Sequence, residues 1–139
     1  IKLAKRFKLP EIVYKGIEEH HGDSIIRFFY EKAKEQGIQV NKNEYRHLGV
    51  KPTTRESAIL MFADSLEAAC RAIFMKEDAN ENKIRNIIEQ IFNEKISDGQ
   101  LQNSPLTFKE ITLIKDSFQK SLEGLYHQRV LYPESTEEE

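Results

Sequence analysis

The stretch TTRESAILMFAD, residues 53–64, decides the fold class of this chain. Thr53 and Glu56 stand three residues apart, as in a capping box, the pattern that begins many helices. The residues that follow, 58–63, are all apolar. A helix that is apolar on every face for nearly two turns belongs in the centre of a fold. The stretch therefore predicts a helix of about twenty residues that is buried on all sides.

Shorter helical segments precede this helix. We expect them over residues 1–7, 10–21 and 25–36. The first has no start signal and reads as the last turns of a helix, so we expect the chain to be part of a longer protein. Gly22 is placed to end the second helix, and Asp23 or Ser24 to cap the third. Residues 38–53 lack apolar periodicity and predict a loop.

Two further helical patterns follow. Asp78 with Glu81 and Thr107 with Glu110 fit capping boxes, and apolar residues recur at helical spacing behind each pair. The second pattern ends near Arg129. Nowhere do apolar and polar residues alternate as in a strand. The sequence thus predicts an all-α fold of about five helices. We expect the chain to form one domain, residues 1–132, followed by an acidic tail, residues 133–139, that frays.

The composition excludes several classes of function. The 139 residues carry a formal net charge of -2, so the overall charge does not draw the chain to nucleic acid or to anionic lipid. Cys70 is the only cysteine, which rules out a disulfide framework and a cysteine-based zinc motif. No apolar run approaches the roughly 18 residues of a membrane span. We expect a soluble chain from a reducing compartment.

Two adjacent histidines, His20 and His21, end the second expected helix. Neighbouring side chains on a helix diverge by roughly 100°, so both rings reach one point only if the last turn distorts. The simpler interpretation is a pair of partly exposed histidines at a helix C-terminus, where the helix dipole favours imidazolium. The alternative interpretation is a pair of metal ligands.

Asp64 directly follows the apolar run of the central helix. A buried carboxylate there needs hydrogen bonds or a cation, which is either a basic side chain or a metal ion. Arg71 need not be that partner, because it stands four residues after Glu67 and can pair with it. A site of His20, His21 and Asp64 would offer nitrogen and oxygen ligands, which suit manganese, iron, zinc or nickel better than calcium or magnesium. Such a set is incomplete, so further ligands are expected from upstream residues.

The expected loop carries several basic side chains. They are Arg46, His47, Lys51 and, just beyond the loop, Arg55. These residues either hold phosphate oxygens or form a solvated surface. Tyr45 either stacks on a base or packs against the protein surface. His127, in the last helix, is interpreted as structural.

Several segments together resemble one family. They are the histidine pair with Gly22, the loop YRHLGVKP at residues 45–52, AILMFADSLEAA at residues 58–69, DGQL at residues 98–101 and GLYHQRVLYP at residues 124–133. The family is that of the cytoplasmic HD domain of the seven-transmembrane HD hydrolases, the PgpH-like cyclic di-AMP phosphodiesterases. The resemblance covers nearly the whole chain. It implies that the chain is the C-terminal part of a helical HD phosphohydrolase domain.

The resemblance also assigns roles to residues. In the family, paired histidines bind one of two metal ions and a late aspartate binds the other, which implies that His20, His21 and Asp64 are metal ligands. The remaining family ligands, among them the His-Asp dyad, are absent here and would lie upstream. The family loop typically reads Gly-Pro-Lys-Pro where this chain has GVKP. The resemblance implies that Lys51 contacts phosphate, with Arg46 and Tyr45 as further substrate-binding residues.

The implied activity of the intact parent is hydrolysis of cyclic di-AMP to a linear dinucleotide. A hydroxide that bridges two metal ions, commonly iron or manganese, would attack the phosphate. The chain alone is expected to be inactive, and whether it binds metal is left open. The parent would hold this domain at the cytoplasmic face of the bacterial inner membrane through an upstream transmembrane region.

Two other interpretations remain, together with an expectation about assembly. The missing His-Asp dyad is compatible with a catalytically degenerate helical module that binds nucleotide or partner proteins and regulates the membrane portion. A different HD nucleotide hydrolase is the other alternative. Apolar faces that upstream helices would normally cover predict either a homodimer of this chain or a rearranged N-terminus.

Overall fold

The computed structural model describes the backbone of residues 1–37, 39–74 and 80–131, and the side chains of these residues up to His127. Its elements in chain order are α1 (Lys2–Arg6), α2 (Glu11–Glu19), α3 (Arg27–Glu35), the 3-10 helix η1 (Lys42–Tyr45), α4 (Arg55–Phe74), α5 (Glu81–Ser97) and α6 (Phe108–Leu131). Within these residues the only β pairing is an isolated antiparallel bridge between Ile25 and Arg46. The all-α prediction is confirmed, with six α-helices where about five were expected.

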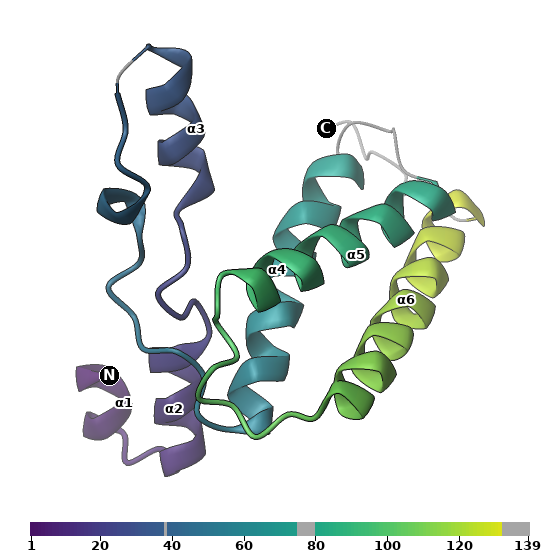
Figure 1. Ribbon diagram of the computed structural model, residues 1–139. Coiled ribbons are helices and arrows are strands. Elements are labelled where there is room, and N and C mark those ends of the chain that lie inside the picture. The colour runs from purple at the N-terminus through teal and green to yellow at the C-terminus, as the bar shows by residue number, and fades with distance from the viewer. Residues whose placement is uncertain (38, 75–79, 132–139) are drawn as a thin grey trace, which may run out of the picture.

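Helices α4, α5 and α6 form the body of the fold, with α5 packed against both neighbours (Figure 1). The core cluster of this body consists of the buried side chains of Met61, Phe62, Leu66, Ile84, Ile88 and Phe92. Phe62 and Phe92 stack with ring centroids 4.0 Å apart, and Phe118 of α6 meets Phe92 edge-on. This core fixes α4, the helix that carries Asp64, against α5.

Helix α4 is less deeply buried than its sequence predicts. Met61 and Phe62 are completely buried, whereas Ile59 and Leu60 expose 37% and 44% of their surface. The helix packs against α2 on one side and α5 on another, so the remaining part of its apolar run faces outward. The prediction of burial on all sides is therefore wrong. The predicted length of about twenty residues is confirmed, because α4 has 20 residues.

The N-terminus of α4 begins one residue later than the predicted capping box. The Thr54 hydroxyl accepts a hydrogen bond from the Ser57 N–H at 3.1 Å, and the Ser57 hydroxyl accepts one from the Thr54 N–H at 3.3 Å. This is the reciprocal geometry of a capping box. Thr54 and Ser57 therefore take the places that the sequence assigned to Thr53 and Glu56.

The other two long helices start with side-chain caps. Thr107 and Glu110 form the predicted box at α6, since each side chain accepts a hydrogen bond from the backbone N–H of the other. Helix α6 continues to Leu131, slightly beyond the predicted end. At α5 the cap is Asn80, whose side chain accepts from the N–H of Lys83. The predicted cap Asp78 lies outside the described residues, as does the tail 133–139.

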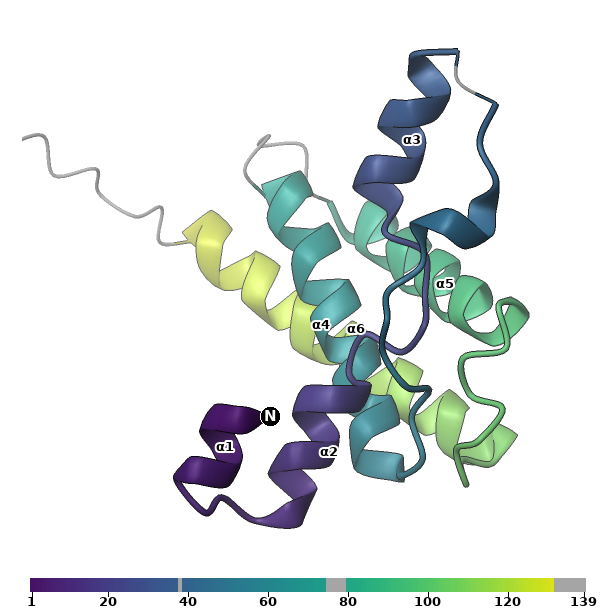
Figure 2. The same cartoon turned by 90° about the vertical axis from the view of Figure 1, so that its left-hand side faces the viewer.

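The first three helices lie outside the three-helix body. Helix α2 packs against α4, α1 packs against α2, and α3 forms an arm with η1 that stands apart from the body in Figure 1 and Figure 2. Gly22 and Gly37, with φ of 58° and 70°, follow α2 and α3 as expected. Neither Asp23 nor Ser24 caps α3, because its N-cap residue Ile26 makes no side-chain cap bond. That predicted cap is wrong.

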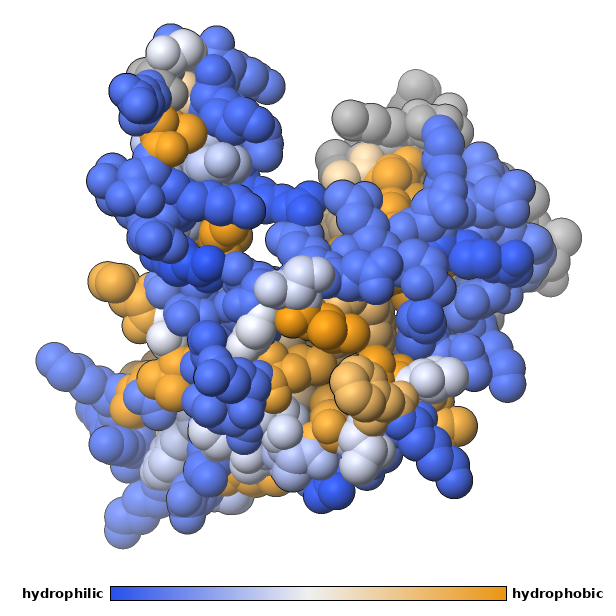
Figure 3. All heavy atoms as spheres, in the orientation of Figure 1, coloured by the Kyte–Doolittle hydropathy of each residue, from blue (hydrophilic) through white to orange (hydrophobic). Residues whose placement is uncertain are grey.

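An open apolar groove runs between α2 and α4. It is lined by Ile12, Val13, Gly16, Ile17, His20, Glu56, Ser57 and Leu60. Apolar side chains are visible over this lower part of the molecule in Figure 3. The groove reaches His20, so it adjoins the candidate site. Within the described residues, no helix has both the length and the apolar character needed to cross a bilayer.

Candidate metal centre

The turn after α2 carries both candidate histidines. His20 is the C-cap residue of α2, and its Nδ1 lies 2.9 Å from the carbonyl oxygen of Gly16. A carbonyl only accepts, so Nδ1 carries the proton and Nε2 is the nitrogen with the free lone pair. The ring centroid of His21 lies 4.0 Å from that of His20. The helix ends just before the two residues, which lets both rings approach one point.

Asp64 of α4 lies beside this turn. Its Oδ2 is 3.4 Å from Nδ1 of His21, and the two side chains are 44% and 47% exposed. The prediction of a buried carboxylate is therefore wrong, because Asp64 leaves α4 toward the histidine turn and not toward the core. Arg71 pairs with Glu67 as predicted. The basic group that faces Asp64 is instead an imidazole.

His47, from the loop after η1, adds a third imidazole. Its ring stacks on that of His21 with centroids 4.6 Å apart and planes 16° from parallel. Burial lowers the pKa of His47, as do the nearby charges of His21 and Lys95, whereas Asp64 has the opposite effect. A lowered pKa keeps the ring neutral at pH 7, which is the form that binds metal ions. His47 therefore belongs to the same cluster as His21 and Asp64.

Lys95 of α5 lies within electrostatic reach of this cluster, and sequence reasoning missed it. Its exposed fraction is only 9%. Burial lowers the pKa of Lys95, and nearby carboxylates, including Asp64, oppose that shift. The sequence does hold a signal: Lys95 stands seven residues after Ile88 and three after Phe92, which places it on the buried face of the helix.

Glu19, immediately before the histidines, joins α2 to α4. It is 5% exposed and accepts hydrogen bonds from the Thr53 N–H at 2.7 Å, the Thr53 hydroxyl at 2.8 Å and the Ser57 hydroxyl at 2.6 Å. Burial alone would raise the pKa of Glu19, but the hydrogen bonds from Ser57 and Thr53 outweigh it and lower the pKa. These bonds set the position of the histidine turn relative to the helix that carries Asp64.

The basic residues of the loop are mostly engaged by other side chains. Arg46 forms a bidentate ion pair with Asp98, with N–O distances of 2.7 and 2.9 Å. Arg55 pairs with an acidic side chain of α6. Lys51 Nζ lies 3.3 Å from the amide oxygen of Gln102, and no carboxylate pairs with it in the described part of the chain. Of Arg46, Lys51 and Arg55, Lys51 is therefore the most available to an anionic ligand.

Two aromatic candidates, Tyr45 and His127, contact other side chains of the protein. The Tyr45 ring meets that of Tyr30 edge-on, with centroids 5.9 Å apart, and the Tyr45 carbonyl accepts a hydrogen bond from the Ile26 N–H. His127 lies far from the cluster in sequence and pairs with Glu81 at 3.1 Å. These contacts favour the packing interpretation of Tyr45 and the structural interpretation of His127.

Two of the predicted ligands, His21 and Asp64, meet directly, and the ring of His20 lies beside that of His21. Among the described residues, no group of three or more His, Cys, Asp and Glu side chains is arranged to hold a metal ion. His21 and Asp64 nevertheless place a nitrogen and an oxygen side by side, and Nε2 of His20 has a free lone pair. This donor set fits one side of a centre for a transition metal that takes further ligands from elsewhere.

Comparisons with known proteins identify relatives over nearly the whole chain. No protein-family model matches. The chain is 39% identical over 134 residues to the cyclic-di-AMP phosphodiesterase PgpH of Bacillus subtilis and 36% identical over 133 residues to that of Listeria monocytogenes. Each alignment covers 96% of this chain and 18% of the relative. The chain thus spans about a fifth of the length of these curated relatives.

Solved structures agree with the sequence relatives. The crystal structure of the L. monocytogenes PgpH HD domain matches with a TM-score of 0.79 and 34% identity, over 91% of this chain and 57% of that one. The same domain in complex with cyclic-di-AMP matches with a TM-score of 0.82 and 36% identity, over 94% and 60%. The fold and most of its sequence therefore correspond to one segment of that domain.

Proposed function

Because the chain is homologous to the HD domain of the PgpH proteins over nearly its whole length, we propose that it is the C-terminal part of a metal-dependent phosphodiesterase domain. The proposed substrate of the intact parent is a cyclic dinucleotide, cyclic di-AMP. The observation that carries the proposal is the placement of His20, His21 and Asp64 on one accessible surface, in a chain 36% identical to the HD domain crystallised with cyclic-di-AMP. In this proposal the chain alone is inactive.

His20, His21 and Asp64 are the proposed metal ligands. The hydrogen bond from His20 Nδ1 to the Gly16 carbonyl fixes the tautomer whose Nε2 can bind a metal, which is the usual way of orienting such imidazoles. Two divalent ions, iron or manganese, would bind here together with upstream ligands. When bound, they would lower the pKa of a water molecule and offset charge on the phosphate oxygens.

Lys51 is the proposed phosphate contact. Its present partner is the neutral amide of Gln102, which a phosphate oxygen can replace with a stronger, charge-assisted bond. Arg46 and Tyr45 were the other substrate-binding candidates. Because Arg46 is held by Asp98 and Tyr45 packs on α3, the geometry favours a role in holding the loop over direct contact with the substrate.

The proposal extends to location and assembly. We propose that the parent is anchored in the bacterial inner membrane by a region outside this chain, with this domain at the cytoplasmic face. The name PgpH of the relatives and the sequence resemblance support this placement. A homodimer of the isolated chain is also proposed, and the exposed apolar side chains along the α2–α4 groove support it.

The test uses an HD domain that extends upstream through the expected His-Asp dyad. We expect about two metal ions per domain and hydrolysis of cyclic di-AMP. Replacing a metal ligand by Asp64→Ala should reduce hydrolysis by at least about 100-fold and lower the metal content. Asp116→Ala, an exposed carboxylate of α6, is the matched control and should change neither measurement.

Two outcomes would favour the other candidates. A folded extended domain that holds no metal and hydrolyses no cyclic dinucleotide would overturn the proposal. It would favour a catalytically degenerate module that binds nucleotide or partner proteins. Hydrolysis of other nucleotides in a substrate panel, without cyclic di-AMP, would favour a different HD nucleotide hydrolase.

A further inference from the structure

The histidine turn is held only in part by its own helix, through the bond of His20 to the Gly16 carbonyl and that of the Gly22 N–H to the Glu19 carbonyl. Helix α2 ends at Glu19 with His20 as its C-cap residue, and the chain then turns away from the helix before α3 begins. The position of His21 relative to Asp64 therefore depends on contacts that the turn makes with other segments. Glu19 supplies one such contact, to the start of α4. The other contacts come from the C-terminal end of α5 and from the loop after η1.

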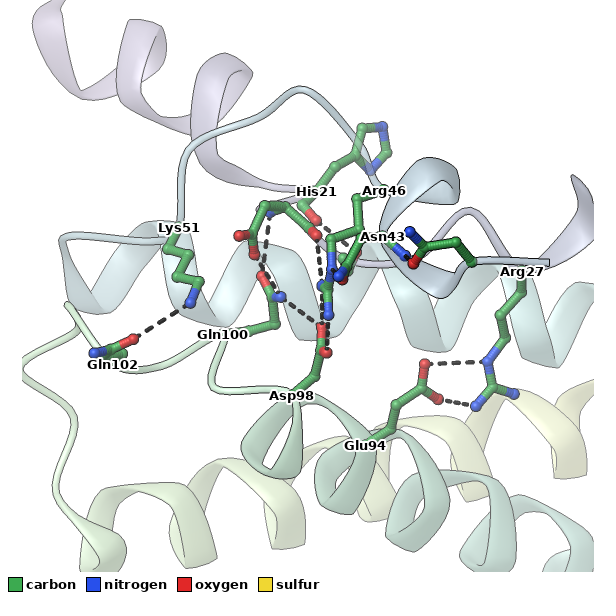
Figure 4. A network of polar contacts seen from close by, with 12 residues as sticks. His21, Arg27, Asn43, Arg46, Lys51, Glu94, Asp98, Gln100 and Gln102 are labelled. Atoms are coloured by element: carbon green, nitrogen blue, oxygen red, sulfur yellow. Dashed lines mark hydrogen bonds and ion pairs between the residues drawn. The ribbon is translucent and has the colours of Figure 1, made fainter. Parts of the chain in front are cut away.

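Gln100, just beyond α5, is completely buried against the turn. Its Oε1 accepts a hydrogen bond from the Asp23 N–H at 3.2 Å. Its Nε2 donates to carboxylate oxygens of Asp23 and Asp98, both at 2.7 Å. Figure 4 shows the Gln100 amide between Asp98 and the histidine turn. Both N–H groups of the amide and its oxygen thus form hydrogen bonds, and two of the three bonds are to Asp23 of the turn.

Arg46 completes this network from the loop side. Besides its ion pair with Asp98, it donates from Nη1 to the Asp23 carbonyl at 2.8 Å. The network therefore joins three segments that are far apart in sequence: the histidine turn, the loop after η1 and the end of α5. Bonds to ionised groups are the stronger kind of hydrogen bond, and these are partly shielded from water.

Two glycines allow the three segments to approach closely. A Cβ at Gly22, where φ is 58°, would lie 2.2 Å from Oε1 of Gln100. A Cβ at Gly49 would lie 2.2 Å from the carbonyl oxygen of Gly22. Any side chain at either position would push the turn away from α5 or from the loop. The turn consequently packs against both neighbours with no spare space at these points.

We propose that Gln100 is a positioning residue for the metal centre: with Asp98 and Arg46, it holds the turn where His21 meets Asp64. The inference rests on the proposed function, because the metal centre is part of that function. The ion pair of Arg27 with Glu94 offers a contrast. This ion pair joins α3 to α5 but does not contact the histidine turn. A purely structural bond should affect stability alone, whereas a positioning residue should also affect the turn and its affinity for metal.

The first measurement is amide hydrogen exchange in this 139-residue chain. Gln100→Glu keeps the side-chain size but turns a donor into an acceptor that faces two carboxylates, so it should open the network without leaving a cavity. We expect exchange at Asp23 and His47 to accelerate by at least about tenfold. Arg27→Gln should leave these two amides unchanged. Equal protection of both amides in wild type and Gln100→Glu would contradict the proposed contact.

The second measurement is Mn²⁺ affinity by calorimetry in the upstream-extended HD domain. Gln100→Glu should weaken Mn²⁺ binding by at least about tenfold, whereas Arg27→Gln should not. Gln100→Met, which is similar in size and uncharged, should weaken it too, and it replaces Gln100→Glu if that variant does not fold. Unchanged affinity in the Gln100 variants, beside a wild type that binds Mn²⁺, would overturn the inference and leave the proposed function standing. A wild-type domain that binds neither Mn²⁺ nor Fe²⁺ and hydrolyses no cyclic dinucleotide would overturn both.

Discussion

The carboxylate of Glu19 joins the end of α2 to the start of α4. It accepts hydrogen bonds from Thr53 and Ser57 in a site that is 5% exposed. Glu19→Gln would turn an amide N–H₂ toward these donors and leave one of them unpaired. We expect the free energy of unfolding at pH 7 to fall by about 1–3 kcal/mol. Urea denaturation measures this loss, and Glu18→Gln, an exposed neighbour, should stay within about 0.5 kcal/mol of wild type.

The stability difference between wild type and Glu19→Gln should also depend on pH. The pKa of Glu19 in the folded protein lies below the ordinary value of 4.5. A lowered folded pKa means that the carboxylate contributes its full stability above the ordinary pKa and loses it as the pH falls through the folded value. The difference should thus be constant between pH 7 and about 5 and should shrink below about pH 4. An undiminished difference at pH 3 would show that the charge of Glu19 is not what stabilises the join.

For single residues, the candidate metal ligands are easier to predict from the sequence than the residues that position those ligands. His20, His21 and Asp64 can be singled out because of their residue type and their helix-end or helix-face positions. Gln100 carries no such sign, since its burial depends on Asp23, 77 positions away in the chain. The exposure of Asp64 was mispredicted for a related reason. An apolar run predicts burial of the run, but it does not specify which way the next side chain points.

At the scale of helices, substitutions at the N-terminus of α4 can test whether the observed cap or the predicted cap stabilises the helix. The Thr54 hydroxyl accepts from the N–H of Ser57, so Thr54→Ala should lower the free energy of unfolding by about 1 kcal/mol. Glu56 is exposed and has no part in this cap, so Glu56→Ala should change it by less than about 0.5 kcal/mol. Urea denaturation of the two variants decides between them. A larger loss for Glu56→Ala would restore the cap that the sequence predicts.

Apolar periodicity predicts where the helices lie, but it does not always predict the residue at which each helix begins. The all-α class and the lengths of α4 and α6 follow from apolar spacing that persists over many turns. The start of α4 shifted because Thr53 hydrogen-bonds Glu19. The cap of α3 failed because Ser24 donates to the carbonyl of His21 and Asp23 binds Gln100. Tertiary partners outcompete local caps at these places, and a single sequence does not show which partner is near.

At the scale of the whole molecule, the apolar surface along α2 and α4 is the feature that most affects behaviour in solution. Its members include Ile12, Val13, Ile17 and Leu60, which are 55%, 38%, 42% and 44% exposed. Contiguous apolar patches of this kind mark interaction sites or lead to self-association. We therefore expect the isolated chain to form a concentration-dependent dimer through this surface. Light scattering over a dilution series measures it, and a monodisperse monomer at every concentration would contradict the expectation.

A single charge on this surface should separate the dimer into monomers. Ile12→Lys places an ammonium group in the middle of an apolar contact, where burying it without a partner costs several kcal/mol. Because the side chain is exposed in the monomer, the fold itself should lose little stability. Leu113→Lys is the matched control, since this side chain of α6 is 60% exposed and lies outside the α2–α4 groove. Dissociation by Ile12→Lys alone would place the contact at α2, whereas dissociation by Leu113→Lys would move it to α6.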